Sequence, residues 1–192
     1  MAEKDRLKWD KKYRQKPTLL KTRPPSPLLV KHLSSLNGAC AIDLACGSGR
    51  HTLYLLEHGF CVDAVDISSV ALQTLASKTK GKEVTLLRED LDTFTPQMHR
   101  YDLAVMSNYL DRALIRRTIA TLKPGALFFI ETYMDHPENE KKDSNPDFLL
   151  APNELPGFFD DGFEILAYGE YPNESYELYR MYKQGIIAKK HV

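Results

Sequence analysis

Short apolar runs alternate with amphipathic stretches along the middle of this chain. Apolar runs that stop at turn residues are typical of strands buried on both faces, and apolar positions three and four residues apart indicate helices. The strand-like runs are 40–44, 60–66, 83–88, 101–106 and 126–133, and the helix-like stretches are 28–36, 51–58, 68–80 and 111–122. This alternation predicts an α/β fold with a doubly wound, mostly parallel sheet.

The N-terminal part has a different pattern. Residues 4–16 predict a charged helix with Trp9 and Tyr13 one turn apart on one face, and several prolines predict an extended arm over 17–27. No repeat or second apolar core follows. The chain is therefore divided into an N-terminal helix with a proline-rich arm, 1–27, and one domain, 28–192.

The C-terminal part also breaks the alternation. Residues 134–152 predict a long polar loop, and residues 153–159 predict a short helix. The strand-like runs 163–171 and 178–189 then follow each other with almost no helix between them. Since parallel neighbours need a long crossover, we expect an antiparallel hairpin that completes a seven-stranded sheet.

Composition supports a single globular domain. The chain has 192 residues, of which 43% are hydrophobic and 27% are charged. Its longest apolar run, Ala126–Ile130, is far below the ~20 residues of a membrane span, and the N-terminus lacks the apolar segment of a signal peptide. Three cysteines without C-x-x-C spacing favour reduced thiols in a cytoplasmic protein.

Charge is balanced overall but unevenly distributed. Residues 1–32 carry ten basic and three acidic side chains, whereas residues 131–177 carry two basic and thirteen acidic ones. A basic arm can bind anions or nucleic acid, and it can also lie against the acidic third of its own chain. The zero net charge favours the second interpretation.

The first strand ends in a glycine-rich turn with an acidic residue in front of it. Gly47 and Gly49 permit a tight turn and a close ligand approach, and the next helix aims its free amides at the ligand. A dinucleotide site needs a third glycine, which is Thr52 here. Asp43, four residues before Gly47, suits a cationic group such as the ammonium of a methionine moiety, or it is a structural cap.

Acidic residues also follow the second and third strands. Asp66, 19 residues after Gly47, can accept two hydrogen bonds from a ribose diol, or it can cap the next helix. Asp90, or Asp92 in its place, can accept from an exocyclic adenine amine, with Leu91 as an apolar neighbour under the ring. Together these residues predict a site for an adenosine-containing cofactor.

The ordered set of motifs resembles the class I S-adenosylmethionine-dependent methyltransferases. It consists of Asp43-x-Ala45-x-Gly47-x-Gly49, Asp66, Asp90-Leu91 and Lys123-Pro124-Gly125. The resemblance covers residues 28–190 and implies that fold, with S-adenosylmethionine as cofactor and S-adenosylhomocysteine as product. It implies these cofactor-binding residues: Asp43, Ala45, Gly47, Gly49, Asp66, Ile67, Asp90, Leu91 and Asn108.

A narrower similarity is to the tellurite-resistance branch of that family and its bacterial relatives. It rests on the stretches 47–55 and 59–68, on Glu131-Thr132-Tyr133 and on Trp9-Asp10-x-x-Tyr13. The resemblance implies that the N-terminal segment folds over the cofactor, and the alternative is ordinary packing of a surface helix. Where tellurite-resistance members carry Leu-His-Arg, this chain has Leu178-Tyr179-Arg180 and lacks the histidine.

Methyl transfer from a sulfonium requires alignment and water exclusion more than a dedicated catalytic residue. We expect a small, anionic or thiol-like acceptor, and we name no catalytic residue. The histidines lack metal-ligand spacing, so no metal is expected. The candidate acceptor-binding residues are Trp9, Tyr13, Tyr109, Arg112 and Tyr133, and the alternative for Arg112 is a helix-surface role.

Three other functions stay open at this point. One is a cofactor-binding module without catalysis, and another is a nicotinamide-dependent oxidoreductase, against which Asp43 and Thr52 argue. A third is an RNA methyltransferase that uses the basic arm. Nucleic acid is a disfavoured partner, since Ser107-Asn108-Tyr109-Leu110 replaces the Asn-Pro-Pro-Tyr of amino-directed methylases. The sequence does not predict the oligomeric state.

Overall fold

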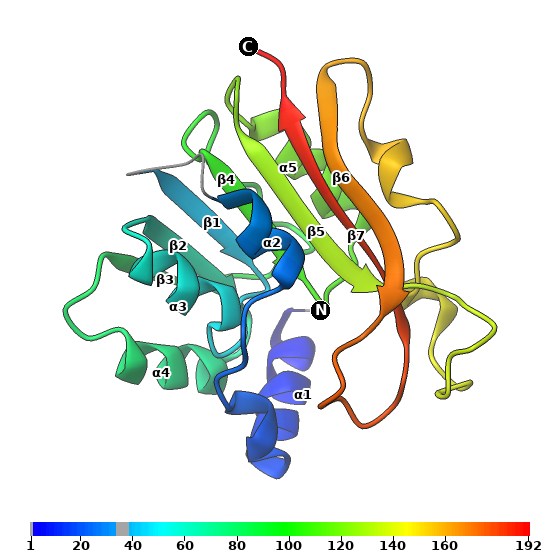
Figure 1. Cartoon of the computed structure of the whole chain (residues 1–192). Coiled ribbons are helices and arrows are strands. Elements are labelled where there is room, and N and C mark those ends of the chain that lie inside the picture. The colour runs from blue at the N-terminus through cyan, green and yellow to red at the C-terminus, as the bar shows by residue number, and fades with distance from the viewer. Residues whose placement is uncertain (1, 34–38) are drawn as a thin grey trace.

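The computed structural model describes residues 2–33 and 39–192, which contain a seven-stranded sheet of order β3-β2-β1-β4-β5-β7-β6 (Figure 1). Strands β1 to β5 pair in parallel, and β7 pairs antiparallel with β5 and β6. The strands are β1 (Cys40–Leu44), β2 (Cys61–Asp66), β3 (Val84–Arg88), β4 (Leu103–Ser107), β5 (Leu127–Tyr133), β6 (Phe163–Pro172) and β7 (Tyr182–Lys190). The predicted fold class and its C-terminal hairpin are confirmed.

Helices bury apolar side chains on both faces of the sheet. Leu29 and Leu55 belong to one core cluster, and Leu114 and Leu155 belong to the other. The helices are α1 (Ala2–Gln15), α2 (Pro27–His32), α3 (Arg50–Glu57), α4 (Ser69–Lys78) and α5 (Arg112–Thr121), with 3₁₀ helices η1 (Pro17–Leu20), η3 (Pro146–Phe148) and η4 (Leu155–Phe158). Among the described residues, none of the helices has the length and apolar character that a membrane crossing requires.

The strand order reverses at β1, which lies between β2 and β4. In open parallel sheets, ligands bind beyond the carboxyl ends of the strands at such a reversal.

Ser68 accepts a hydrogen bond from the amide of Ala71 as the N-cap of α4, as the sequence predicts. α1 packs against α4 below the sheet in Figure 1. The carboxyl ends of β1, β2 and β4 and helix α1 therefore lie at the same edge of the sheet.

Some predicted boundaries were wrong. β7 begins at Tyr182 rather than at 178, because Leu178 is 81% exposed in the connection from β6. The predicted helix 153–159 is the shorter η4, and the arm 17–27 contains η1. The helix predicted over 28–36 corresponds to α2, and positions 34–38 lie outside the described residues.

The prediction of reduced thiols was wrong for two of the three cysteines. Cys40 and Cys61 form a disulfide, and Cys46 is a buried free thiol. The pairing follows from the sheet register, which sets Cys40 opposite Cys61 on β1 and β2 with their Cα atoms 4.7 Å apart. A separation of 21 residues gives no sign of this proximity in the sequence.

Candidate active site

The turn after β1 has an unusual backbone. Ala45, Gly47 and Gly49 have φ angles of +58°, +54° and +91°, in the left-handed region that glycine adopts most readily. A Cβ at Gly47 would lie 3.3 Å from the Tyr13 hydroxyl, and one at Gly49 would overlap the Leu75 side chain. The predicted glycine turn therefore fits tightly between α1 and α4.

Asp43 lies beneath this turn, at the end of β1. Its Oδ2 accepts hydrogen bonds from the Thr52 amide at 3.0 Å and from the Thr52 hydroxyl at 2.6 Å. Burial outweighs these bonds and raises the pKa of Asp43 to about 7. These bonds to the first turn of α3 match the structural role that the sequence analysis gave as the alternative for Asp43. A contact between Asp43 and a cofactor stays a prediction.

Asp66 joins the turn to the start of α4. Its Oδ2 accepts from the Gly47 amide at 2.9 Å, and its Oδ1 accepts from the Ser68 amide at 2.8 Å. Burial raises the pKa of Asp66, which these hydrogen bonds oppose. Ile67 follows in the same segment and is half-buried. The structure thus brings Asp43, Gly47 and Asp66 together, and their contact with a cofactor stays a prediction.

The other predicted cofactor residues flank this centre. The Asp90 carboxylate accepts from the Asp92 amide at 3.1 Å, while Leu91 is buried beside it. Asn108, after β4, has a left-handed φ of +55° and donates its amide to the Glu131 carbonyl. Both segments lie at carboxyl strand ends, where a ligand would reach them.

Helix α1 closes this edge through a carboxylate that the sequence analysis missed. Asp10 is 1% exposed, and its Oδ1 accepts from the Ser68 hydroxyl at 2.7 Å and from the Val70 amide at 3.2 Å. The rings of Trp9 and Tyr13 lie one turn apart, as predicted, and are tilted by 34° with their centroids separated by 5.9 Å. Asp10 thus ties α1 to the N-terminus of α4, where a negative charge is favourable.

Arg112 does not behave as a free acceptor clamp. It forms a two-pronged ion pair with Glu154 at 2.6 and 3.0 Å, and it donates to the carbonyls of Asp147 and Leu149. These bonds anchor the loop after β5. Tyr109 is half-buried against the core. Binding of the methyl acceptor by Tyr109 or Arg112 stays a prediction.

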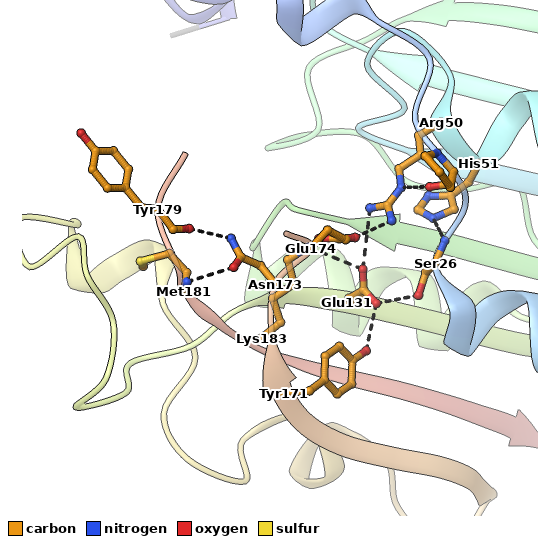
Figure 2. A network of polar contacts seen from close by, with 11 residues as sticks. Ser26, Arg50, His51, Glu131, Tyr171, Asn173, Glu174, Tyr179, Met181 and Lys183 are labelled. Carbon is orange, nitrogen blue, oxygen red and sulfur yellow. Dashed lines mark hydrogen bonds and ion pairs between the residues drawn. The ribbon is translucent and has the colours of Figure 1, made fainter. Parts of the chain in front are cut away.

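A buried ionic cluster lies across β5, β7 and α3, and the sequence analysis missed it (Figure 2). Lys183 Nζ donates to Glu174 Oε2 at 2.7 Å, and Arg50 pairs with the other oxygen of Glu174. Glu131 Oε2 accepts from the Ser26 hydroxyl at 2.6 Å and from the Tyr171 hydroxyl at 2.9 Å. Lys183 lies among other polar residues of β7, such as Gln184 and Lys189, so the local sequence does not mark it as buried.

Two polar atoms near this cluster lack hydrogen-bond partners among the described residues. They are Glu131 Oε1 and Ser107 Oγ. Glu131 lies opposite Ser107 in the register of β5 and β4, so both side chains leave the same face. Glu131 Oε1 is 3.7 Å from Lys183 Nζ and 3.9 Å from Arg50 Nη1. Buried polar groups are normally satisfied, so these atoms indicate a ligand or water position.

His51 and Tyr133 complete the surroundings of the cluster. The Ser26 amide donates to His51 Nε2 at 3.2 Å, which requires a neutral ring. Burial, followed by the charges of Arg50 and Lys183, lowers the pKa of His51 to about 3. Lys183 Nζ also lies 5.1 Å from the Tyr133 ring centroid, so Tyr133 is the predicted acceptor residue that contacts the cluster.

Comparison with known proteins finds similarity in the central segment of the chain. Residues 41–125 match the family described as a methyltransferase domain. The ubiquinone biosynthesis O-methyltransferase of Coxiella burnetii is 23% identical over 117 residues, 56% of this chain and 50% of that protein. The cypemycin N-terminal methyltransferase of a Streptomyces species is 32% identical over 119 residues, 56% and 48% of the two chains. This chain therefore matches about half the length of these relatives.

Solved structures share the fold. TehB from Haemophilus influenzae superposes with a TM-score of 0.75 and 20% identity, over 86% of this chain and 62% of that one. A 1,6-didemethyltoxoflavin-N1-methyltransferase of Burkholderia thailandensis, solved with S-adenosylhomocysteine, gives 0.64 and 20%, over 86% and 76%. These likenesses support the class I methyltransferase fold.

The residues at the turn fit the cofactor of this family. The left-handed turn favours glycine at 47 and 49, where a side chain would meet Tyr13 or Leu75. Within the described residues, no group of three or more histidine, cysteine or acidic side chains is arranged to hold a metal. The turn would suit an adenosyl cofactor with a cationic methionine end, and its contacts with such a cofactor stay a prediction.

Proposed function

We propose that this chain, in which residues 41–125 match a methyltransferase domain, is an S-adenosylmethionine-dependent class I methyltransferase that acts on a small anionic acceptor. The relatives include O- and N-methyltransferases, so the family match leaves the acceptor open. The thiol-like acceptor that the sequence also suggested has no supporting contact in the cluster. An anion is favoured by the cations beside the glycine turn.

The observation that carries the proposal is the convergence of Arg50 and Lys183. Arg50 is the first residue of α3 and follows Gly49 directly, and Lys183 comes from β7. The Lys183 side chain is 1% exposed and that of Arg50 is 15% exposed. Both cations contact the Glu174 carboxylate, whose side chain is 21% exposed, so the arrangement supports recognition of an acceptor anion that takes the place of this carboxylate.

The protein's part in such a reaction is positioning and exclusion of water. When bound, the cofactor supplies an activated methyl group on a sulfonium. The Gly47 turn and Asp66 would hold it, and Trp9 and Tyr13 of α1 would shield it from water. Arg50 and Lys183 would orient the acceptor. Charge-assisted contacts of this type fix both position and specificity.

The proposal is tested by turnover with paired acceptors of similar shape, one anionic and one neutral in each pair. Formation of S-adenosylhomocysteine is measured for wild type, Lys183→Met and Arg50→Gln. We expect anionic acceptors to be preferred and each variant to lose about 10- to 150-fold in kcat/KM for them. Calorimetric titration of S-adenosylmethionine checks that cofactor affinity is retained.

Lys189→Met is the matched control, because Lys189 is exposed on the same strand as Lys183. It should leave kcat/KM unchanged. Equal loss with neutral and anionic acceptors, or preferential turnover of neutral or thiol acceptors, contradicts the proposal. Cofactor binding without turnover of any acceptor supports the non-catalytic alternative instead.

A further inference from the structure

Glu174 differs from the other members of the ionic cluster in its position. Arg50, Glu131 and Lys183 belong to α3, β5 and β7, whereas Glu174 lies in the connection between β6 and β7. Its side chain is 21% exposed, against 1% for Lys183 and 2% for Glu131. Glu174 therefore closes the cluster from the solvent side.

The charges balance only while this carboxylate is in place. Arg50 and Lys183 contribute two positive charges, and Glu131 and Glu174 contribute two negative ones. Burial by itself would raise the pKa of Glu174, but the charge and hydrogen bond of Lys183, followed by Arg50, lower it to about 2. If Glu174 left, a buried site with one excess positive charge would remain, and another anion could replace it.

The Glu174 side chain can leave without unfolding the connection. Asn173 closes the base of the loop by accepting from the Met181 amide at 3.0 Å and donating to the Tyr179 carbonyl at 2.9 Å (Figure 2). The Asn173 amide also donates to the Met181 carbonyl at 2.7 Å. These bonds involve no side-chain atom of Glu174, so a rotamer change is enough to move its carboxylate.

Space for a small ligand lies beside the cluster. A cavity of about 370 Å³ is lined by Ser26, Leu28, Glu131, Glu174 and Lys183, among others. This volume is at the lower end of the range of small-molecule sites. Glu131 lines this cavity, and its buried Oε1 has no hydrogen-bond partner among the described residues, while its Oε2 accepts from Ser26 and Tyr171.

We propose that Glu174 holds the place of an acceptor carboxylate on Arg50 and Lys183, and that Glu131 Oε1 receives a hydrogen bond from a hydroxyl or amino group of the same acceptor. The acceptor class is then a small hydroxy- or amino-carboxylic acid. This inference rests on the proposed function and narrows it. A carboxylate is chosen because it reproduces the two-pronged contact that Glu174 now makes.

The test is rescue of Glu174→Ala by small carboxylates, read as thermal stability and as calorimetric affinity. Removing Glu174 uncovers the cations, so we expect the variant to melt below wild type and to be restabilised by acetate. Glycolate, which adds a hydroxyl, should bind at least ~10-fold more tightly than acetate. Glycolamide, which lacks the charge, should have no effect. Wild type should respond weakly to all three compounds.

Two further variants complete the design. Glu177→Ala removes the same charge from the same loop and should gain no response to carboxylates. Glu131→Gln, combined with Glu174→Ala, should keep the acetate response and reduce the preference for glycolate. If Glu174→Ala is too unstable to purify, Glu174→Gln serves with the same readouts.

The outcomes separate this inference from the proposed function. Absence of carboxylate rescue in folded Glu174→Ala, or equal rescue by glycolamide, overturns the placeholder role even if turnover prefers anions. Turnover that prefers neutral acceptors overturns the proposed function, even if carboxylates still bind the variant. Equal affinity for acetate and glycolate removes the role assigned to Glu131.

Discussion

At the residue scale, buried carboxylates determine the local structure of the candidate site. The sequence predicted Asp43 from its place four residues before Gly47, and Asp66 from its place at the end of the next strand, 19 residues after Gly47. It could not predict that their oxygens bind Thr52, Gly47 and Ser68, since those contacts depend on how the turn closes. The Glu131–Lys183 cluster was missed for a related reason, because its members are far apart in the chain.

Asp66→Asn tests the cofactor site at this scale. The change removes a negative charge from the turn and replaces an acceptor oxygen with a donor, so S-adenosylmethionine should bind about 10- to 150-fold more weakly. Calorimetry measures this affinity, with NAD titrated in parallel. Asp63→Asn is the control, because Asp63 lies on the same strand but pairs with Arg100 and Tyr101. Binding of NAD instead of S-adenosylmethionine would favour the oxidoreductase alternative.

At the element scale, α1 decides how the cofactor edge is closed. The sequence predicted the helix and its Trp9–Tyr13 face from local spacing, but left open whether the face is a lid or ordinary packing. The buried Asp10 on the N-terminus of α4 favours a lid, because it is a specific polar tie rather than a diffuse apolar contact. Neither Ser68 nor Val70 is close to Asp10 in the sequence, which explains why the tie was not predicted.

Asp10→Ala tests the lid. Loss of the two hydrogen bonds to α4 should let α1 open more often, so S-adenosylmethionine should dissociate about 10-fold faster, as measured by stopped-flow displacement. Glu3→Ala is the control on the same helix, because Glu3 is exposed and bonds Arg6. An unchanged dissociation rate for Asp10→Ala would mean that α1 is an ordinary packing helix.

At the scale of the whole molecule, the sheet was predictable and the pairing of its distant parts was not. Apolar runs that alternate with helical stretches predict the type and chain order of β1 to β5, although β3 is only partly buried. The disulfide between Cys40 and Cys61 and the start of β7 depend on register, which periodicity does not encode. The same long-range burial couples global stability to pH through His51 and Asp43.

His51 and Asp43 should act on global stability in opposite directions. Burial lowers the pKa of His51 from 6.5 to about 3. Between these values the unfolded chain binds a proton that the folded chain excludes, so the free energy of unfolding decreases as the pH decreases. Burial raises the pKa of Asp43 from 3.8 to about 7, so in that interval the folded chain binds the extra proton and stability falls as pH rises. Urea unfolding between about pH 4 and pH 7 should therefore show a steeper acid loss in Asp43→Asn and a reduced or inverted one in His51→Gln, relative to wild type. Parallel curves for all three proteins would mean that neither group changes its protonation on folding.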